Sequence, residues 1–124
     1  GLFARINKKG CLMRFEESRD QKKVRLTMPL SEFEKNDMIE GGKLVGGRHW
    51  LGASGSERLY FPDHYQSDIG PIFGVRIVNL YINLQEMDLV IEYKERKKRE
   101  TQNKEFAQAI FKAVLQLFQR DFQS

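Results

Sequence analysis

The segment from Asn103 to Phe122 most constrains this chain, because it reads as one long helix that is apolar over most of its circumference. It contains no glycine or proline, and its apolar residues fall on two adjacent stripes of a helical wheel. At about 100° per residue the stripes together span roughly 240°, whereas an ordinary surface helix has an apolar face of ~100°. The first stripe contains Phe106, Ile110, Ala113, Val114 and Leu117, and the second contains Ala107, Phe111, Leu115, Phe118 and Phe122.

A helix with two apolar stripes needs apolar partners on two sides. We expect the chain's own sheet to cover the first stripe, while the remaining loops are polar and offer little cover for the second. We therefore predict that the second stripe joins subunits of a homo-oligomer. The predicted interface residues are Phe111, Leu115, Phe118 and Phe122.

The rest of the chain shows the two-residue alternation of half-buried strands. Val24 to Met28 alternates clearly, and the two best strands, Val75 to Leu84 and Leu89 to Glu95, are joined by a short hairpin connection. One side of the first of these strands carries Val78, Leu80, Ile82 and Leu84. One side of the second carries Leu89, Ile91 and Tyr93.

Shorter strands are expected at Leu2–Ile6, Cys11–Glu17, Lys43–Val45, Arg48–Leu51 and Glu57–Phe61. A short middle helix follows Pro29 and ends at Gly41-Gly42, and 63–71 reads as a polar surface loop. These patterns predict one α+β domain over residues 1–124, with antiparallel sheets of about six to seven strands and a long C-terminal amphipathic helix.

The sequence predicts no membrane-spanning helix, and it leaves the cellular compartment open. No run approaches the ~18 apolar residues of a membrane-spanning helix, and no signal-peptide pattern opens the chain. The chain begins at Gly1, which leaves a removed targeting segment open. The single Cys11 allows no internal disulfide, which favours an intracellular reducing compartment.

The formal net charge of +4 is concentrated between Lys94 and Lys104. That segment holds six basic and two acidic residues, so the remainder of the chain sums to zero. A basic block of this kind indicates an anionic partner such as nucleic acid or a lipid headgroup. A solvated connection between a strand and a helix explains it equally well.

Catalytic and cofactor motifs are missing from the sequence, and we predict a protein that is not an enzyme and has no cofactor or metal site. His49 and His64 lack metal-ligand spacing to another His or Cys, and Cys11 lies on the expected core side of a strand. The glycines between Gly41 and Gly55 lack the spacing of phosphate-binding loops, so we interpret them as positions where strands bend or turn.

The outward positions of the predicted strands are basic, and aromatic residues lie near them. Single-stranded nucleic acid requires this combination, because aromatic rings stack on bases while cations neutralise phosphates. An ordinary solvent-facing sheet with core aromatics is the competing interpretation, and it is the better one for Phe61. The predicted nucleic-acid-binding residues are Lys8, Lys9, Arg14, Arg25, Trp50, Tyr60, Arg76, Tyr81, Lys94 and Arg96.

The order of elements resembles that of the PUR and Whirly families of single-stranded nucleic-acid binders. The resemblance rests on three segments: Asn7-Lys8-Lys9-Gly10-Cys11-Leu12-Met13-Arg14-Phe15, Lys23-Val24-Arg25-Leu26-Thr27-Met28 and Leu59-Tyr60-Phe61-Pro62-Asp63-His64. The resemblance implies curved sheets followed by helices, with subunits associating through the helices and bases lying across the sheets. It places Lys8, Lys9 and Arg14 on a first binding hairpin and Tyr60 and Phe61 on an opposing sheet.

Two alternatives from other classes remain open at this point. A pleckstrin-homology-like barrel with a C-terminal helix would bind phosphoinositides or peptides, and the basic turn Lys8-Lys9 would suit a headgroup. A protein–protein assembly domain would use the helix itself as its interface. The leading hypothesis is an oligomeric module that binds single-stranded nucleic acid, either DNA or RNA.

Overall fold

The computed structural model describes residues 13–17, 23–32, 35–95 and 104–123. Within these ranges the chain is an α+β protein with one six-stranded antiparallel sheet and a long C-terminal helix, which confirms the predicted fold class. The strand expected at Leu2–Ile6 and the turn that holds Lys8 and Lys9 lie outside the described residues.

The sheet has the strand order β1-β2-β6-β5-β4-β3. Its long central strands are β5 and β6, the hairpin that the sequence predicts most clearly. In the described part of the chain the sheet is open, with β1 and β3 at its edges, so it is not the closed barrel of the pleckstrin-homology-like alternative. The strands are β1 (Arg14–Glu17), β2 (Lys23–Pro29), β3 (Arg48–Leu51), β4 (Glu57–Tyr60), β5 (Val75–Asn83) and β6 (Asp88–Glu95).

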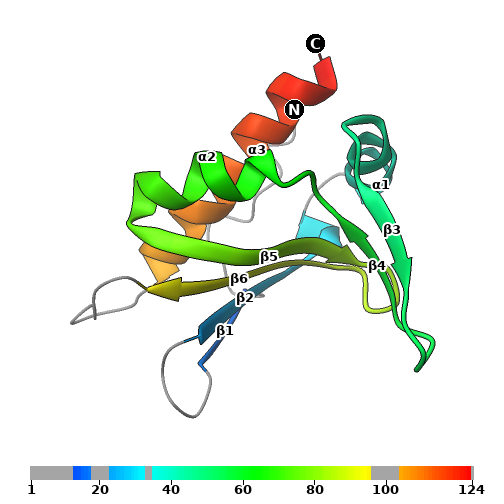
Figure 1. The fold of residues 1–124 in the computed structure, drawn as a ribbon, viewed down its shortest axis with the longest axis horizontal. Coiled ribbons are helices and arrows are strands. Elements are labelled where there is room, and N and C mark those ends of the chain that lie inside the picture. The colour runs from blue at the N-terminus through cyan, green and yellow to red at the C-terminus, as the bar shows by residue number, and fades with distance from the viewer. Residues whose placement is uncertain (1–12, 18–22, 33–34, 96–103, 124) are drawn as a thin grey trace.

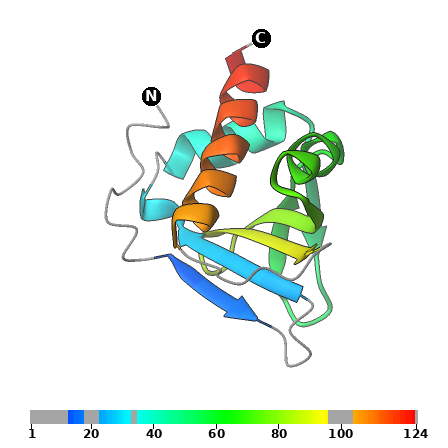
Figure 2. The same cartoon turned by 90° about the vertical axis from the view of Figure 1, so that its left-hand side faces the viewer.

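The three α-helices lie on one side of the sheet, above it in Figure 1, and Figure 2 shows the same layering from the side. They are α1 (Lys35–Leu44), α2 (His64–Phe73) and α3 (Lys104–Gln123), and a single turn of 3-10 helix, η2 (Leu30–Glu32), follows β2. The β3–β4 hairpin extends below the central strands, away from the helices (Figure 1). None of the described helices lies on the opposite side of the sheet.

The core lies between the sheet and the helices. Alternate residues of β2 and β6 point into it, as the sequence pattern predicts, and each is almost completely buried. These residues are Val24, Leu26, Met28, Leu89, Ile91 and Tyr93. In β5 the register shifts between Ile77 and Asn79, so Ile77, Leu80 and Ile82 face the core while Val78 is only partly buried. That irregularity corrects the continuous alternation expected for this strand.

Both apolar stripes of α3 are covered by this chain. Phe111, Leu115 and Phe118 of the second stripe are fully buried, and only Phe122 is exposed, at 36%. The cover comes from α1 and α2, since Gly41 of α1 lies directly against the Phe118 ring, and α2 also contacts α3. The expectation of an uncovered second stripe is therefore wrong, and the argument for assembly through these side chains loses its basis. Assembly itself stays a prediction.

Two local expectations in the helical layer are also wrong. The expected loop 63–71 is largely α2, whose residues Tyr65 and Ile69 are buried one helical turn apart. The expected break at Gly41-Gly42 lies inside α1, and the expected strand at Lys43–Val45 is the end of that helix and the turn after it. A Cβ atom at Gly41 would lie 2.4 Å from Cζ of Phe118, so this glycine permits close helix packing and does not end the helix.

Candidate nucleic-acid interface

The candidate site is the side of the sheet on which the described residues place no helix, and we call it the open face. Strand pairing assigns side chains to it, because partners in register share a side. At one end of the sheet, Tyr60 pairs with Arg48 and with Tyr81, and Trp50 pairs with Arg58. At the other end, Lys94 pairs with Lys23 and with Arg76. Between them, Arg25 pairs with Glu16 and with Glu92. Seven of the ten predicted binding residues therefore share this face, and each of the six strands contributes at least one. They are Arg14, Arg25, Trp50, Tyr60, Arg76, Tyr81 and Lys94.

The other three predicted residues, Lys8, Lys9 and Arg96, lie outside the described residues, as does most of the basic block between Lys94 and Lys104. Phe61 is buried in the core at 1% exposure, in agreement with the interpretation preferred for it from sequence.

Tyr81 lies on the open face but is only 3% exposed, because the Arg58 guanidinium covers its ring at 4.3 Å from the centroid. Its expected role in base stacking is corrected accordingly: the ring supports Arg58 and is not accessible to a base. Burial, followed by the nearby Glu92 charge, raises the pKa of the Tyr81 hydroxyl, so the group stays protonated at neutral pH.

Arg58 organises an aromatic cluster at the β3–β4 end of the open face. Its guanidinium lies 5.6 Å from the centroid of the Trp50 ring and donates a hydrogen bond of 2.9 Å to the Tyr60 hydroxyl. The Tyr60 and Tyr81 rings are tilted relative to each other, with their centroids 5.2 Å apart. Trp50 remains 45% exposed, so this cluster, Trp50, Arg58, Tyr60 and Tyr81, presents the indole ring at the surface, while Arg58 contacts both the indole and the tyrosines.

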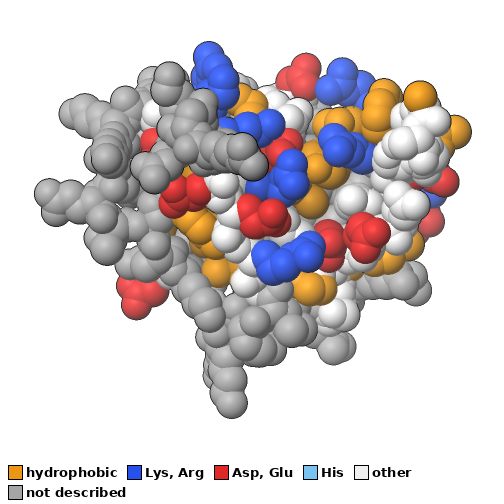
Figure 3. All heavy atoms as spheres, turned by 90° about the horizontal axis from the view of Figure 1, so that it is seen from below, with side chains coloured by type: hydrophobic (Ala, Val, Ile, Leu, Met, Phe, Trp, Pro, Cys, Tyr) orange, Lys and Arg blue, Asp and Glu red, His pale blue; other side chains and the backbone are white. Residues whose placement is uncertain are grey.

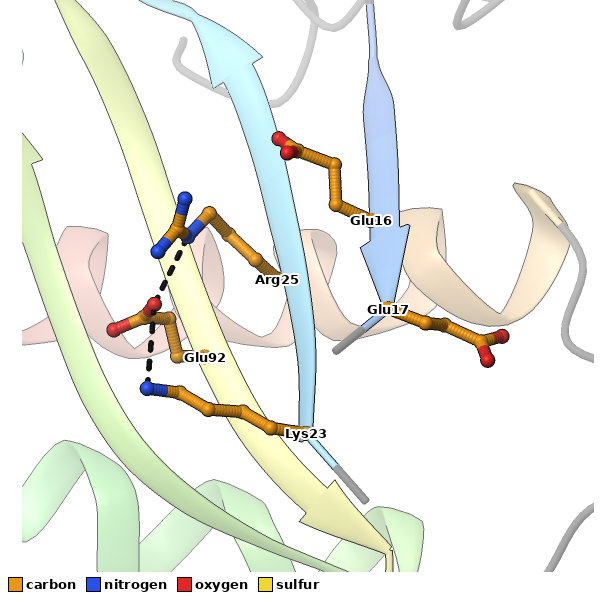
Figure 4. A pocket seen from close by; sticks show the side chains of 5 residues that line it. All are labelled: Glu16, Glu17, Lys23, Arg25 and Glu92. Atoms are coloured by element: carbon orange, nitrogen blue, oxygen red, sulfur yellow. Dashed lines mark hydrogen bonds and ion pairs between the residues drawn. The ribbon is translucent and has the colours of Figure 1, made fainter. Parts of the chain in front are cut away.

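Glu92 joins the central strands of the open face. Figure 4 shows Lys23 and Arg25 of β2 reaching toward this carboxylate of β6. One carboxylate oxygen accepts a hydrogen bond from Nε of Arg25 at 2.9 Å and lies 3.6 Å from Nζ of Lys23. The other accepts from Nδ2 of Asn79 at 2.8 Å. Burial alone would raise the pKa of Glu92, but these hydrogen bonds and charges outweigh it and lower the pKa below its ordinary value.

Asp88 shows the opposite balance on the same face. Its side chain accepts a hydrogen bond of 3.0 Å from Arg14, whose side chain is 61% exposed. Burial is the largest influence on Asp88 and exceeds the attraction of that solvent-exposed guanidinium, so the pKa of Asp88 is raised. Arg14 is thus partly committed to an internal ion pair, which reduces its freedom to contact a ligand.

Three cations lie side by side across the sheet, at the end away from the aromatic cluster. The register places Lys23 of β2 opposite Lys94 of β6, and Lys94 opposite Arg76 of β5. Lys23 contacts Glu92, whereas Lys94 and Arg76 have no ion-pair partner among the described residues. Like charges in directly opposed positions are destabilising, so this basic row, Lys23, Lys94 and Arg76, is an arrangement that an anion would relieve.

Basic side chains outnumber acidic ones over the open face as a whole. Figure 3 looks onto this side of the molecule and shows Lys and Arg groups interspersed with Asp and Glu groups, next to apolar surface. The register places Glu16, Asp88 and Glu92 there as the acidic residues. The basic residues are Arg14, Lys23, Arg25, Arg48, Arg58, Arg76 and Lys94.

Sequence reasoning missed Arg58, Glu92 and Lys23. Strand alternation could have found two of them. Arg58 precedes the inward Leu59, and Glu92 lies between the inward Ile91 and Tyr93, so both side chains are expected to point outward. That signal assigns a face but no partner. The Glu92 contacts with Arg25 and Lys23 join residues 67 and 69 positions apart, and only the pairing of β2 with β6 brings them together.

The histidines form two exposed pairs outside the open face's central strands. His49 lies 3.0 Å from a Glu57 oxygen, and His64 lies 2.9 Å from an Asp121 oxygen. The hydrogen bond from His64 is the largest influence on Asp121 and lowers its pKa. Within the described ranges no group of three or more His, Cys, Asp and Glu side chains is positioned to hold a metal ion. Nor is any described helix long and apolar enough to cross a membrane.

Comparison of this chain with known protein families, with curated proteins and with solved structures found no match.

Proposed function

We propose that this protein binds single-stranded nucleic acid across the open face of its sheet. The observation that carries the proposal is the convergence of seven of the ten residues predicted for this role. They are spread from Arg14 to Lys94, yet pairing brings them to the side of the sheet that is free of helices in the described part of the chain. A surface of this kind can take an extended strand without rearrangement of the core.

The basic row supplies the contacts to phosphate. Lys94 and Arg76 lie beside each other on neighbouring strands, and neither is neutralised by a described partner. A phosphate between them relieves their mutual repulsion and releases the counterions that otherwise surround the nucleic acid.

The aromatic cluster supplies the contacts to bases. Trp50 is accessible, and Arg58, held between Trp50 and Tyr81, adds a planar cation to the same surface. Stacking of a base on an exposed aromatic ring contributes about 1–3 kcal/mol. Bases within a duplex are already stacked on each other and present only their edges, so this surface favours single strands.

Fluorescence anisotropy with labelled single-stranded DNA, single-stranded RNA and duplex DNA of equal length tests the proposal. We expect binding of single strands at ~50 mM salt, with log K falling by about 0.7 per unit of log salt for each phosphate neutralised. Scrambling the oligonucleotide should keep most of the affinity, because phosphate contacts carry no sequence information. The proposal fails if single strands give no anisotropy change at ~50 mM salt, or if duplex binds as tightly as they do.

A further inference from the structure

The outer edge of β3 carries backbone groups that have no partner strand among the described residues. β3 is the last strand of the sheet, and Figure 1 shows it at the right-hand end. All four of its residues, Arg48–Leu51, are exposed. Backbone N–H and C=O groups on an edge of this kind are available to a further strand.

The pairing of β3 with β4 shows which residues these groups belong to. The amide of Gly52 donates to the carbonyl oxygen of Ser56 at 2.8 Å, which continues the β3–β4 ladder by one pair. In an antiparallel ladder, every second pair of opposite residues exchanges hydrogen bonds. The backbone of Trp50 is therefore bonded to β4, whereas the N–H and C=O groups of His49 and Leu51 point away from β4.

The spacing of these two residues lets the edge pair with a copy of itself. When two β3 strands run antiparallel about a two-fold axis at Trp50, His49 of each strand lies opposite Leu51 of the other. Each of these pairs exchanges two hydrogen bonds, so the outward groups of both residues are satisfied. An axis at His49 would instead place Leu51 opposite Gly47, whose amide already donates to Gly42 at 2.8 Å.

The side chains are compatible with the axis at Trp50. The two indoles lie opposite each other on the open face, and aromatic pairs across strands are stabilising. The remaining pairs are His49 with Leu51 and Arg48 with Gly52, so no like charges are opposed. The Trp50 ring is folded over Gly52, where a Cβ atom would lie 2.4 Å from its Cη2 atom. Arg48 of the second copy is thereby brought beside this ring, whose face attracts a cation.

The two edges of the sheet differ in their protection against such pairing. β1 has charged side chains at three of its four positions, and charged residues on an edge oppose pairing with another chain. β3 has one charged residue, Arg48, with no proline and no bulge, and it ends in Trp50 and Leu51, which are 45% and 63% exposed. Because β3 is only four residues long, its pairing suits a weak and reversible association.

We infer that this protein forms a weak two-fold dimer in which the β3 strands of two copies pair antiparallel about Trp50. The two six-stranded sheets then form one continuous sheet of twelve strands. Residues paired across strands share a side, so both open faces lie on the same side of the dimer. This interface is separate from α3, and it does not depend on nucleic-acid binding.

Sedimentation of the unaltered protein from ~10 µM to ~1 mM measures the association. The mass should rise from that of one chain toward that of two chains and go no further, because a two-fold interface closes on itself. A mass of one chain over the whole range overturns the inference. Growth beyond two chains also overturns it, since that result indicates head-to-tail pairing of different edges.

A matched pair of lysine substitutions locates the interface. Leu51→Lys places a charge on the β3 edge and should abolish the rise in mass. Ile72→Lys adds the same charge at an exposed apolar position of α2, 70% exposed, and should leave the rise unchanged. Association that persists in Leu51→Lys, or is lost equally in both variants, would show that β3 is not the interface. Circular dichroism checks the fold of each variant.

Disulfide formation tests the position of the axis, with Cys11 replaced by serine in every sample. Residues on the axis belong to a pair that is not hydrogen-bonded across the interface, with Cα atoms about 4.5 Å apart, so Trp50→Cys should form a covalent dimer under mild oxidation. In Leu51→Cys the two cysteines are diagonal neighbours about 7–8 Å apart, beyond the reach of a disulfide. Crosslinking of Leu51→Cys in place of Trp50→Cys would contradict this axis. The mass of the unaltered protein decides whether a dimer forms even if a variant fails to fold.

Discussion

The two faces of the sheet are built from the same six strands but differ in nearly every physical respect. On the covered face, alternate side chains join those of the helices in one apolar core. On the open face, the intervening side chains include seven cations, three carboxylates and the aromatic cluster. Strand alternation thus separates the side chains that stabilise the fold from those that we propose bind nucleic acid. Substitutions on the covered face should change stability, and most substitutions on the open face should change binding alone.

The largest effect is expected on the covered face, at the second stripe of α3. Phe111→Glu should unfold the protein as completely as Ile110→Glu, because both positions are fully buried and an unpaired buried charge costs several kcal/mol. Circular dichroism on heating and solution mass measure the outcome. Phe122→Glu, at a partly exposed position, is the control and should change the melting temperature little. If Phe111→Glu kept its melting temperature but changed the mass of the particle in solution, the prediction that the second stripe joins subunits would be supported again.

A smaller loss is expected where α1 meets α3. In Gly41→Ala the new methyl group would overlap the Phe118 ring, which is fully buried and has little room to move. Overpacking of this kind costs about 1–3 kcal/mol, which exceeds the gain of up to ~1 kcal/mol from replacing glycine inside a helix. Chemical denaturation measures the difference, with Lys43→Ala at an exposed position of the same helix as control. Increased stability in Gly41→Ala would show that the two helices are not in close contact.

Glu92 is an exception to this division between the two faces, because it lies on the open face but stabilises the fold. Glu92→Gln should lower the free energy of unfolding at pH 7 by about 1–3 kcal/mol, since the charge that Arg25 and Lys23 contact is lost.

The pH dependence of that loss follows from the lowered pKa of Glu92. The stabilisation is complete above the pKa of glutamate in the unfolded chain and disappears as the pH falls through the lower pKa of the folded state. Denaturation curves of both proteins should therefore converge on the acid side, below about pH 4. Glu16→Gln, at an exposed position of β1, should lie within about 0.5 kcal/mol of the unaltered protein at every pH. A difference that persists unchanged into acid would show that Glu92 acts through packing and not through its charge.

Much of the fold was predictable because its strands alternate clearly. The β5–β6 hairpin, the inward faces of β2 and β6 and the C-terminal helix all follow from local patterns. The helix α2 does not, because Gly70 and Pro71 interrupt its sequence and its propensity is weak. It forms because Tyr65 and Ile69 are buried against the rest of the core, and Gly74 ends it in the left-handed conformation at a φ of 66°.

The cover of the second stripe of α3 was beyond sequence reasoning for a related reason. It depends on Gly41 meeting Phe118 across 77 positions of sequence, and a glycine pair is ordinarily a helix-ending signal. The candidate site was predictable as a set of outward residues. Its internal order was not, since the burial of Tyr81 under Arg58 and the contacts of Glu92 arise only from strand register.

The central claim is that the open face binds single strands through its cations, and two double variants with equal charge test it. Arg76→Gln with Lys94→Gln removes two cations from the basic row, whereas Lys43→Gln with Lys112→Gln removes two exposed cations from the helical layer. Anisotropy with one labelled single-stranded oligonucleotide is measured for both over a range of salt concentrations.

We expect the first variant to lose affinity and to show a salt slope smaller by about 1.4, two phosphates at about 0.7 each, with its melting temperature unchanged. The second should bind almost as the unaltered protein does. Equal losses in both variants would mean that net charge alone attracts the nucleic acid, and the open face would no longer be its binding surface.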